Sequence, residues 1–198
     1  MILLYDGTFE GFLSLVYEVY YKKLKPTKIY KTLPNEILFE EILEINSSKE
    51  SGIKVLNAIK TKFPKEILEI NSSKERGIKV LNAIKTKFPK EILEKILNIF
   101  MCDSKEFEMA LLEYIVIGFK DSKQLYNINN SCVFYINNLE KELFKNVHRM
   151  SGFIRFEELE DKTLYAKIES KFNIVYFLGR HFLKRFNNQN FIIHDINR

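Results

Sequence analysis

Residues 41–65 read EILEINSSKESGIKVLNAIKTKFPK, and residues 66–90 repeat them as EILEINSSKERGIKVLNAIKTKFPK. The two copies differ at one position, Ser51 against Arg76, and the tetrapeptide EILE begins a third time at Glu91. In each copy a Ser-Ser-Lys-Glu cap precedes apolar residues at helical spacing, and a Phe-Pro pair closes the unit. Two copies are too few for a solenoid, so they predict a tandem duplicated helical unit within another fold.

The rest of the chain places predicted strands near both ends and helices between them. The predicted strands are 2–5, 28–33, 152–156, 163–168 and 191–193. The predicted helices outside the duplication are about 9–24, 91–100, one capped at Asp103 that includes 107–118, 132–147 and 172–186. We therefore expect an α+β fold with a helix-rich middle and a small, mainly antiparallel sheet built from N- and C-terminal strands. Residues 1–198 are expected to form a single domain.

Composition excludes several classes of protein. Hydrophobic residues make up 46% of the 198 residues, enough for a core, and no apolar run is long enough to span a membrane. The start, MILLYDGTFE, does not resemble a signal peptide. Two cysteines cannot form a disulfide framework or a four-cysteine metal site, and the P-loop, GxGxxG, GxSxG and HExxH motifs are absent. We expect a cytoplasmic protein that does not enter a membrane.

Positive charge is distributed unevenly by residue type. The chain has 31 Lys and Arg against 26 Asp and Glu, a formal net charge of +5. Five of the six arginines and all three histidines lie in residues 148–198, while lysine supplies the positive charge elsewhere. Arginine is the planar bidentate donor for phosphate and carboxylate, so this segment is where we expect phosphate binding.

The spacing of residues within this segment indicates which of them are candidates for binding and catalysis. One face of the helix expected at 172–186 carries Arg180, His181, Lys184 and Arg185. The other nominated residues stand at predicted junctions or strand ends, where side chains converge on clefts. The candidates for phosphate or nucleic-acid binding are Arg149, Arg155, Arg180, His181, Lys184, Arg185 and Arg198. The candidates for acid/base catalysis are His148, His194 and Asp195, expected to line one cleft. A structural role for these histidines and arginines remains an alternative, and no metal site or cofactor is predicted.

Four segments together carry a family resemblance. MILLYDGTFEGFLSLVYEVY, HRMSGFIRFEEL, LYAKIESKFNIVYFLGRHFLKRF and FIIHDINR occur in this order. The chain resembles a bacterial family of DNA-metabolism and DNA-repair proteins whose domain is of unknown function. The resemblance implies a genomic neighbour of the radical-SAM class, and some members are fused to a uracil-DNA-glycosylase-like domain. It supplies no established reaction.

The chain departs from the family pattern in three ways. Family members carry one copy of the capped helical unit, have tryptophan where this chain has Phe191, and continue past Arg198. The resemblance therefore implies one extra 25-residue copy and a missing C-terminal segment.

These observations lead to three functional hypotheses. The first is a DNA-metabolism or repair protein that binds nucleic acid or nucleotide through a basic His/Arg cleft, as an accessory to a radical-SAM partner. The second is a nucleotide- or DNA-processing enzyme that uses histidine as its acid or base. The third is a non-catalytic adaptor. Whether the chain is an enzyme stays open at this point.

Overall fold

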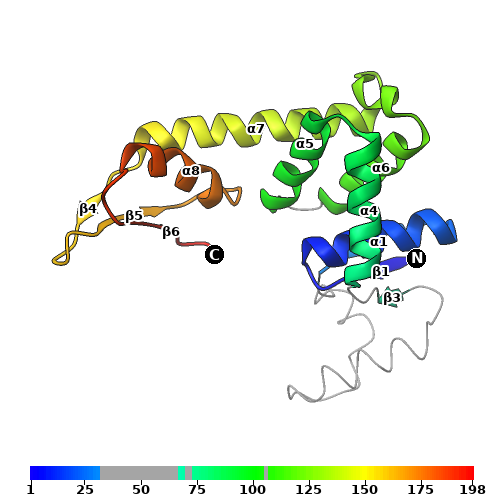
Figure 1. The fold of residues 1–198 in the computed structure, drawn as a ribbon, viewed down its shortest axis with the longest axis horizontal. Helices are drawn as coiled ribbons and strands as arrows, with labels where there is room; N and C mark the ends of the chain where they lie inside the picture. Colours follow the sequence, from blue (N-terminus) through cyan, green and yellow to red (C-terminus); the bar gives the residue numbers. More distant parts are fainter. Residues whose placement is uncertain (32–66, 70–72, 105–106) are drawn as a thin grey trace, which may run out of the picture. The chain divides into compact units, whose positions relative to one another are not determined.

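The computed structural model describes residues 1–31, 67–69, 73–104 and 107–198 (Figure 1). Contacts between Cα atoms divide the chain into two compact units. The first unit comprises Met1–Lys90 with Leu112–Lys123, and the second comprises Glu91–Leu111 with Gln124–Arg198. Each unit holds one small three-stranded sheet and several helices, so the described part of the chain is helix-rich with small sheets. The expectation of a single domain stays a prediction.

The sheet of the first unit is parallel. Its central strand β1 (Ile2–Leu4) pairs with β2 (Lys28–Tyr30) on one side and with β3 (Ile67–Glu69) on the other. Helix α1 (Phe9–Lys22) connects β1 to β2. A helix between two neighbouring strands returns the chain to the end where the first strand began, so both strands run the same way.

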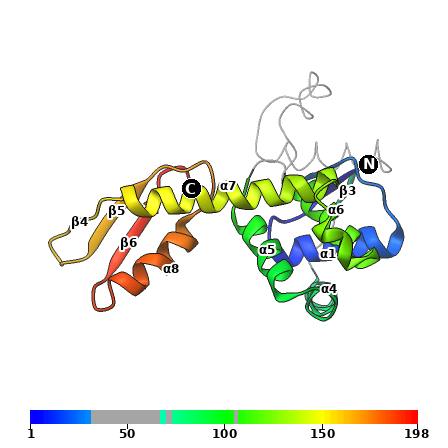
Figure 2. The same cartoon turned by 90° about the horizontal axis from the view of Figure 1, so that it is seen from above.

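The second sheet begins with a hairpin and continues with the same strand–helix–strand arrangement. Strands β4 (Glu157–Glu158) and β5 (Leu164–Ile168) pair antiparallel, and β5 pairs parallel with β6 (Phe191–Asp195). Helix α8 (Val175–Arg185) connects β5 to β6. Figure 2 shows α8 beside these strands.

The expected small, mainly antiparallel sheet is therefore wrong in two respects. Three of the four strand pairings among the described residues are parallel, and the N-terminal strands pair in a different sheet from the C-terminal ones. The physical reason is connectivity: in each sheet a helix lies between paired strands, and only β4 and β5 are joined by a tight turn.

Helix α1 begins where the sequence predicts. The Thr8 hydroxyl accepts a hydrogen bond from the Gly11 amide at 2.9 Å, and Asp6 Oδ1 accepts from the Thr8 amide at 2.9 Å. A Cβ atom at Gly11 would lie 2.0 Å from Asp6 Oδ1, so a side chain here would displace the Asp6 carboxylate from its hydrogen bonds with Thr8. The helix ends at Lys23, whose φ of 53° is in the left-handed region.

The second copy of the duplicated unit forms helix α4 (Lys74–Lys87). Its cap is Ser73, the second serine of the predicted Ser-Ser-Lys-Glu cap, and the Ser73 hydroxyl accepts from the Arg76 amide at 3.4 Å. The helix ends before the Phe-Pro pair, as predicted. The first copy, 41–65, lies outside the described residues.

Helices α1 and α4 approach each other closely. The Ser14 hydroxyl accepts from the Ser73 amide at 3.0 Å and donates to the Ser73 carbonyl at 3.2 Å. A Cβ atom at Gly77 would lie 3.1 Å from Glu10 Cγ, tighter than most real contacts. Polar bonding at one turn and a small residue at the next bring the two backbones together.

A buried carboxylate lies between the same helices. The Glu18 side chain is only 4% exposed, and its carboxylate pairs with Lys22 on α1 and with Arg76 Nη1 on α4 at 2.9 Å. A buried carboxylate is costly unless cations and donors surround it. Arg76 is also the one residue that distinguishes the second copy from the first, which has Ser51 there.

The repeated tetrapeptide EILE adopts two conformations. At 66–69 it contributes strand β3, whereas at 91–94 it lies in helix α5 (Lys90–Met101). The tetrapeptide at 66–69 runs into Ile-Asn-Ser-Ser, which favours a break and a cap, while the one at 91–94 runs into KILNIF at helical spacing. The following residues, and not the tetrapeptide, decide the structure.

The remaining elements complete the second unit. Helix α6 (Phe107–Lys120) contributes residues to both units, and a 3-10 turn (Ser122–Tyr126) leads to α7 (Ser131–Phe153). Lys95 on α5 donates to Asn137 on α7 at 2.6 Å. Within the described ranges, no helix has both the length and the apolar composition needed to cross a membrane.

The duplication provides a matched test of the Glu18 pair. Chains lacking either 41–65 or 66–90 would be identical except that one keeps Arg76 and the other has Ser51 at that position. We expect the chain that lacks 66–90 to be less stable by about 1–3 kcal/mol, because a buried carboxylate loses a charged donor. Urea denaturation followed by circular dichroism measures the difference.

A Glu18→Gln background is the control for this comparison. Without the carboxylate, the arginine has no charge to compensate, so the two deletions should then unfold at similar urea concentrations. Equal stability of the two deletions with Glu18 intact would contradict the structural role of Arg76.

Candidate nucleic-acid interface

Helix α8 has one buried side and one basic side. Leu178 and Phe182 are buried, and Phe182 packs edge-on against Phe156 at 4.9 Å between ring centroids. The predicted basic residues are all exposed: Arg180, His181, Lys184 and Arg185. The helix has no acidic residue, so its exposed side carries positive charge without negative charge, beside the exposed side chains of Tyr176 and Leu183.

These cations have no carboxylate partner among the described residues. Arg180, Lys184 and Arg185 form no ion pair with any side chain that the structure describes. The Arg180 guanidinium instead lies 5.9 Å from the ring centroid of Tyr176, which is 51% exposed. The surface thus combines uncompensated charge with an accessible aromatic ring.

His194 is oriented by a tyrosine. Tyr165 Oη and His194 Nδ1 are 2.7 Å apart, and Lys167 Nζ lies 5.9 Å from the Tyr165 ring centroid. Lys167 is the register partner of His194 on the neighbouring strand. Side chains at every second position of a strand share a face, so these three lie on one face of the sheet.

Asp195 lies on the opposite face from His194. It is 3% exposed, and its Oδ2 accepts from Arg198 Nη1 at 2.9 Å. Arg198 also donates to the backbone carbonyls of Ser170 and Lys171, each at 3.2 Å. The two residues therefore form a structural clamp, and Asp195 does not pair with His194, because consecutive strand residues point to opposite faces.

Helix α7 changes the surroundings of three further candidates. It continues to Phe153, so His148 and Arg149 are exposed residues within a helix and not at its junction with a strand. Arg155 follows the helix instead of lying on a strand, and its Nη1 is within 3.3–3.4 Å of the carbonyls of residues 152–154. It therefore satisfies the unpaired carbonyls at the helix end.

The structure does not bring His148 and His194 into one cleft. Figure 1 shows α7 and α8 on the same side of strands β5 and β6. That side of the sheet carries the buried residues Ala166, Ile168 and Asp195. Because His194 belongs to the other face, the sheet separates it from His148 on α7.

Sequence reasoning missed the aromatic partners of the basic residues. Tyr176 precedes Arg180 by four positions, the spacing at which helical side chains meet, and this signal was available in the sequence. Tyr165 and Lys167 alternate along one strand, but their pairing with His194 depends on the parallel register. In the part of the chain that is described, no group of three His, Cys, Asp or Glu side chains is placed to hold a metal.

The C-terminal part of the chain resembles a known protein family. Residues 105–198 match the family model of a domain of unknown function, DUF4130. The match includes α7, α8 and the sheet β4–β6, and thus every candidate residue from His148 onward. No curated protein matches the chain.

Substitutions in strand β6 separate structural from exposed residues. Asp195→Asn should destabilise the second unit by about 1–3 kcal/mol, because the Arg198 guanidinium loses a buried charged acceptor. His194→Ala, one residue away on the exposed face, should change stability by less than about 0.5 kcal/mol. Thermal unfolding of the two variants measures the difference, and a larger loss for His194→Ala would contradict the assignment of faces.

Proposed function

We propose that the second unit binds nucleic acid or nucleotide phosphates through the exposed face of α8, in DNA metabolism or repair. The supporting observation is that Arg180, Lys184 and Arg185 are exposed, lie on a helix without acidic residues and lack carboxylate partners among the described residues. Binding phosphates would neutralise these charges and release counterions from the nucleic acid. Such contacts position a protein on nucleic acid without reading its sequence.

Tyr176 adds a second mode of contact to this proposal. An exposed aromatic ring beside arginine can stack on an unpaired base, and stacking tolerates any base. We therefore infer weak, sequence-independent binding with a preference for single strands. Arg155 and Arg198 are left out of the interface because their guanidinium groups already donate to backbone carbonyls.

The proposed cellular role comes from the family resemblance. It suggests that the protein acts in the bacterial cytoplasm as an accessory to a radical-SAM partner, which would carry out the redox chemistry. In this role the α8 surface would hold the nucleic acid while the partner acts on it.

The salt dependence of binding tests the interface. On a single strand, the slope of log affinity against log salt should become shallower by roughly 0.7 for each phosphate that the protein no longer neutralises. Arg180→Gln with Arg185→Gln should therefore weaken binding of a labelled single-stranded oligonucleotide and flatten the slope by about 1.4. Fluorescence anisotropy at several salt concentrations measures both quantities.

A charge-matched variant provides the control. Lys141→Gln with Lys145→Gln removes two exposed positive charges from α7, outside the proposed interface. It should leave the slope nearly unchanged. Equal effects of the two double variants would mean that net charge alone drives binding, and no binding at low salt would favour the adaptor hypothesis.

A second candidate function is supported by the Tyr165–His194 hydrogen bond. A tyrosine that fixes one imidazole nitrogen leaves Nε2 available to accept or donate a proton, as an acid/base catalyst requires. If the protein processes nucleotides, His194→Ala should reduce turnover by roughly 100-fold or more while the protein remains folded. Tyr165→Phe should produce a smaller loss, because the imidazole would remain but lose its orientation.

A further inference from the structure

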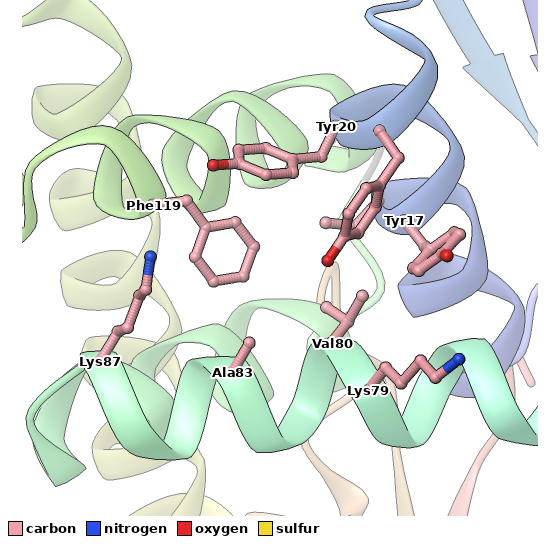
Figure 3. A pocket seen from close by; sticks show the side chains of 9 residues that line it. Tyr17, Tyr20, Lys79, Val80, Ala83, Lys87 and Phe119 are labelled. Carbon is pink, nitrogen blue, oxygen red and sulfur yellow. The ribbon is translucent and has the colours of Figure 1, made fainter.

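A small pocket lies in the first unit among helices α1, α4 and α6. It has a volume of about 170 Å³. Figure 3 shows Tyr20 and Phe119 on one side of it, Val80 and Ala83 on α4 on the other, and Lys87 at the rim. The lining is mainly aromatic and aliphatic, but two lysines and three tyrosines give it polar edges.

The aromatic rings at the pocket form a continuous row. The Tyr17 and Tyr21 ring centroids are 4.3 Å apart, and Tyr20 lies 5.7 Å from Tyr21. Tyr20 also lies 5.3 Å from Phe119, which contacts Phe88 at the same distance. A row of rings offers flat faces and edges against which another planar ring can pack.

The tyrosine hydroxyls at the pocket are not used within the described structure. Tyr17, Tyr20 and Tyr21 neither donate nor accept a hydrogen bond with any described residue. Tyr20 and Tyr21 are also 39% and 65% exposed, so their hydroxyls are accessible to a ligand. These groups can therefore bond to the polar edge of a ligand.

The two lysines at the pocket differ in their partners. Lys79 donates to Glu75 at 2.7 Å, and this hydrogen bond raises the pKa of Lys79 above its usual range. Lys87 has no carboxylate partner among the described residues, and its Nζ lies 5.8 Å from the Phe119 ring centroid. A free cation beside a ring-lined pocket fits a ligand that joins a planar ring to an anion.

We propose that this pocket binds a nucleoside monophosphate, with the base among Tyr20, Phe119 and Ala83 and the phosphate at Lys87. The volume supports a single ring system, because an apolar cavity of roughly 150 Å³ accommodates a benzene ring and sites for drug-sized ligands are about 300–1,000 Å³. The ribose and phosphate would remain outside the pocket, within reach of the rim. The tyrosine hydroxyls would bond to the carbonyl and amide groups of the base.

The charges favour this ligand over an apolar side chain of a partner protein. An apolar side chain would fill the pocket but leave Lys87 and the tyrosine hydroxyls without partners. A free phosphate would use Lys87 but not the rings. Only a ligand with both parts uses all the groups at the pocket.

The first experiment measures binding of UMP, whose single-ring base suits the volume of the pocket, by saturation-transfer NMR and titration on the full chain. Uridine, which lacks the phosphate, should bind about tenfold more weakly. Ribose 5-phosphate, which lacks the base, should bind at least about tenfold more weakly, because base stacking is lost. Equal affinity for ribose 5-phosphate and UMP would overturn the proposal, since it would indicate an anion site only.

The duplication supplies matched controls for two variants. Ala83→Leu should fill the pocket and reduce UMP affinity about tenfold or more, and Lys87→Met should reduce it to the affinity for uridine. Ala58→Leu and Lys62→Met are the same changes in the same local sequence of the first copy. We expect both controls to bind UMP as the unchanged chain does.

Two outcomes separate this proposal from the α8 interface. The variants are compared in an Arg180→Gln, Arg185→Gln background, which removes phosphate binding at α8; UMP should still bind in this background, and Ala83→Leu should still weaken its binding. If Ala83→Leu keeps a cooperative unfolding transition and still binds UMP normally, the pocket is not the site. Should Ala83→Leu prevent folding, Lys87→Met at the exposed rim decides instead. Similar affinities of this variant for UMP and uridine would support the pocket as the site, and a preference for UMP as strong as in the unchanged chain would overturn it.

Discussion

The carboxylate of Glu18 lies between α1 and α4, where it reaches Lys22 on its own helix and Arg76 on the other. This pair fixes which turns of the two helices are in contact, because only one pairing brings the arginine to the carboxylate. The Ser14–Ser73 hydrogen bonds and the close approach at Gly77 lie along the same line of contact. Val80 and Ala83 lie beside the tyrosines of α1 between the same two helices.

Much of the fold could be predicted from local sequence. Thr8 as a cap, the helix that ends before Phe88 and Pro89, and strand β5 all depend on neighbours within a few positions. Strand direction could not be predicted from strand patterns taken singly. It depends on whether a helix or a turn connects two strands, and on which strands finally pair. The two conformations of EILE show the same limit on a smaller scale.

The part of the candidate site that could be predicted is the part whose exposed face follows from helical periodicity alone. The exposed face of α8 follows from a helical period of 3.6 residues, and its four basic residues lie on it. The surroundings of the candidate residues differ from expectation where the length of a helix or the alternation of a strand matters. Helix α7 runs past His148, which changes the surroundings of Arg149 and Arg155, and alternation places His194 and Asp195 on opposite faces.

Residue type does not by itself distinguish structural from binding arginines in this protein. Arg76, Arg155 and Arg198 each direct the guanidinium group at a buried carboxylate or at backbone carbonyls, where several fixed donors satisfy several acceptors. Arg180 and Arg185 have the same group on a helix surface with no described acceptor. The same geometry that suits arginine to phosphate also suits it to helix ends and buried carboxylates. The local supply of acceptors therefore decides which arginines remain available to a ligand.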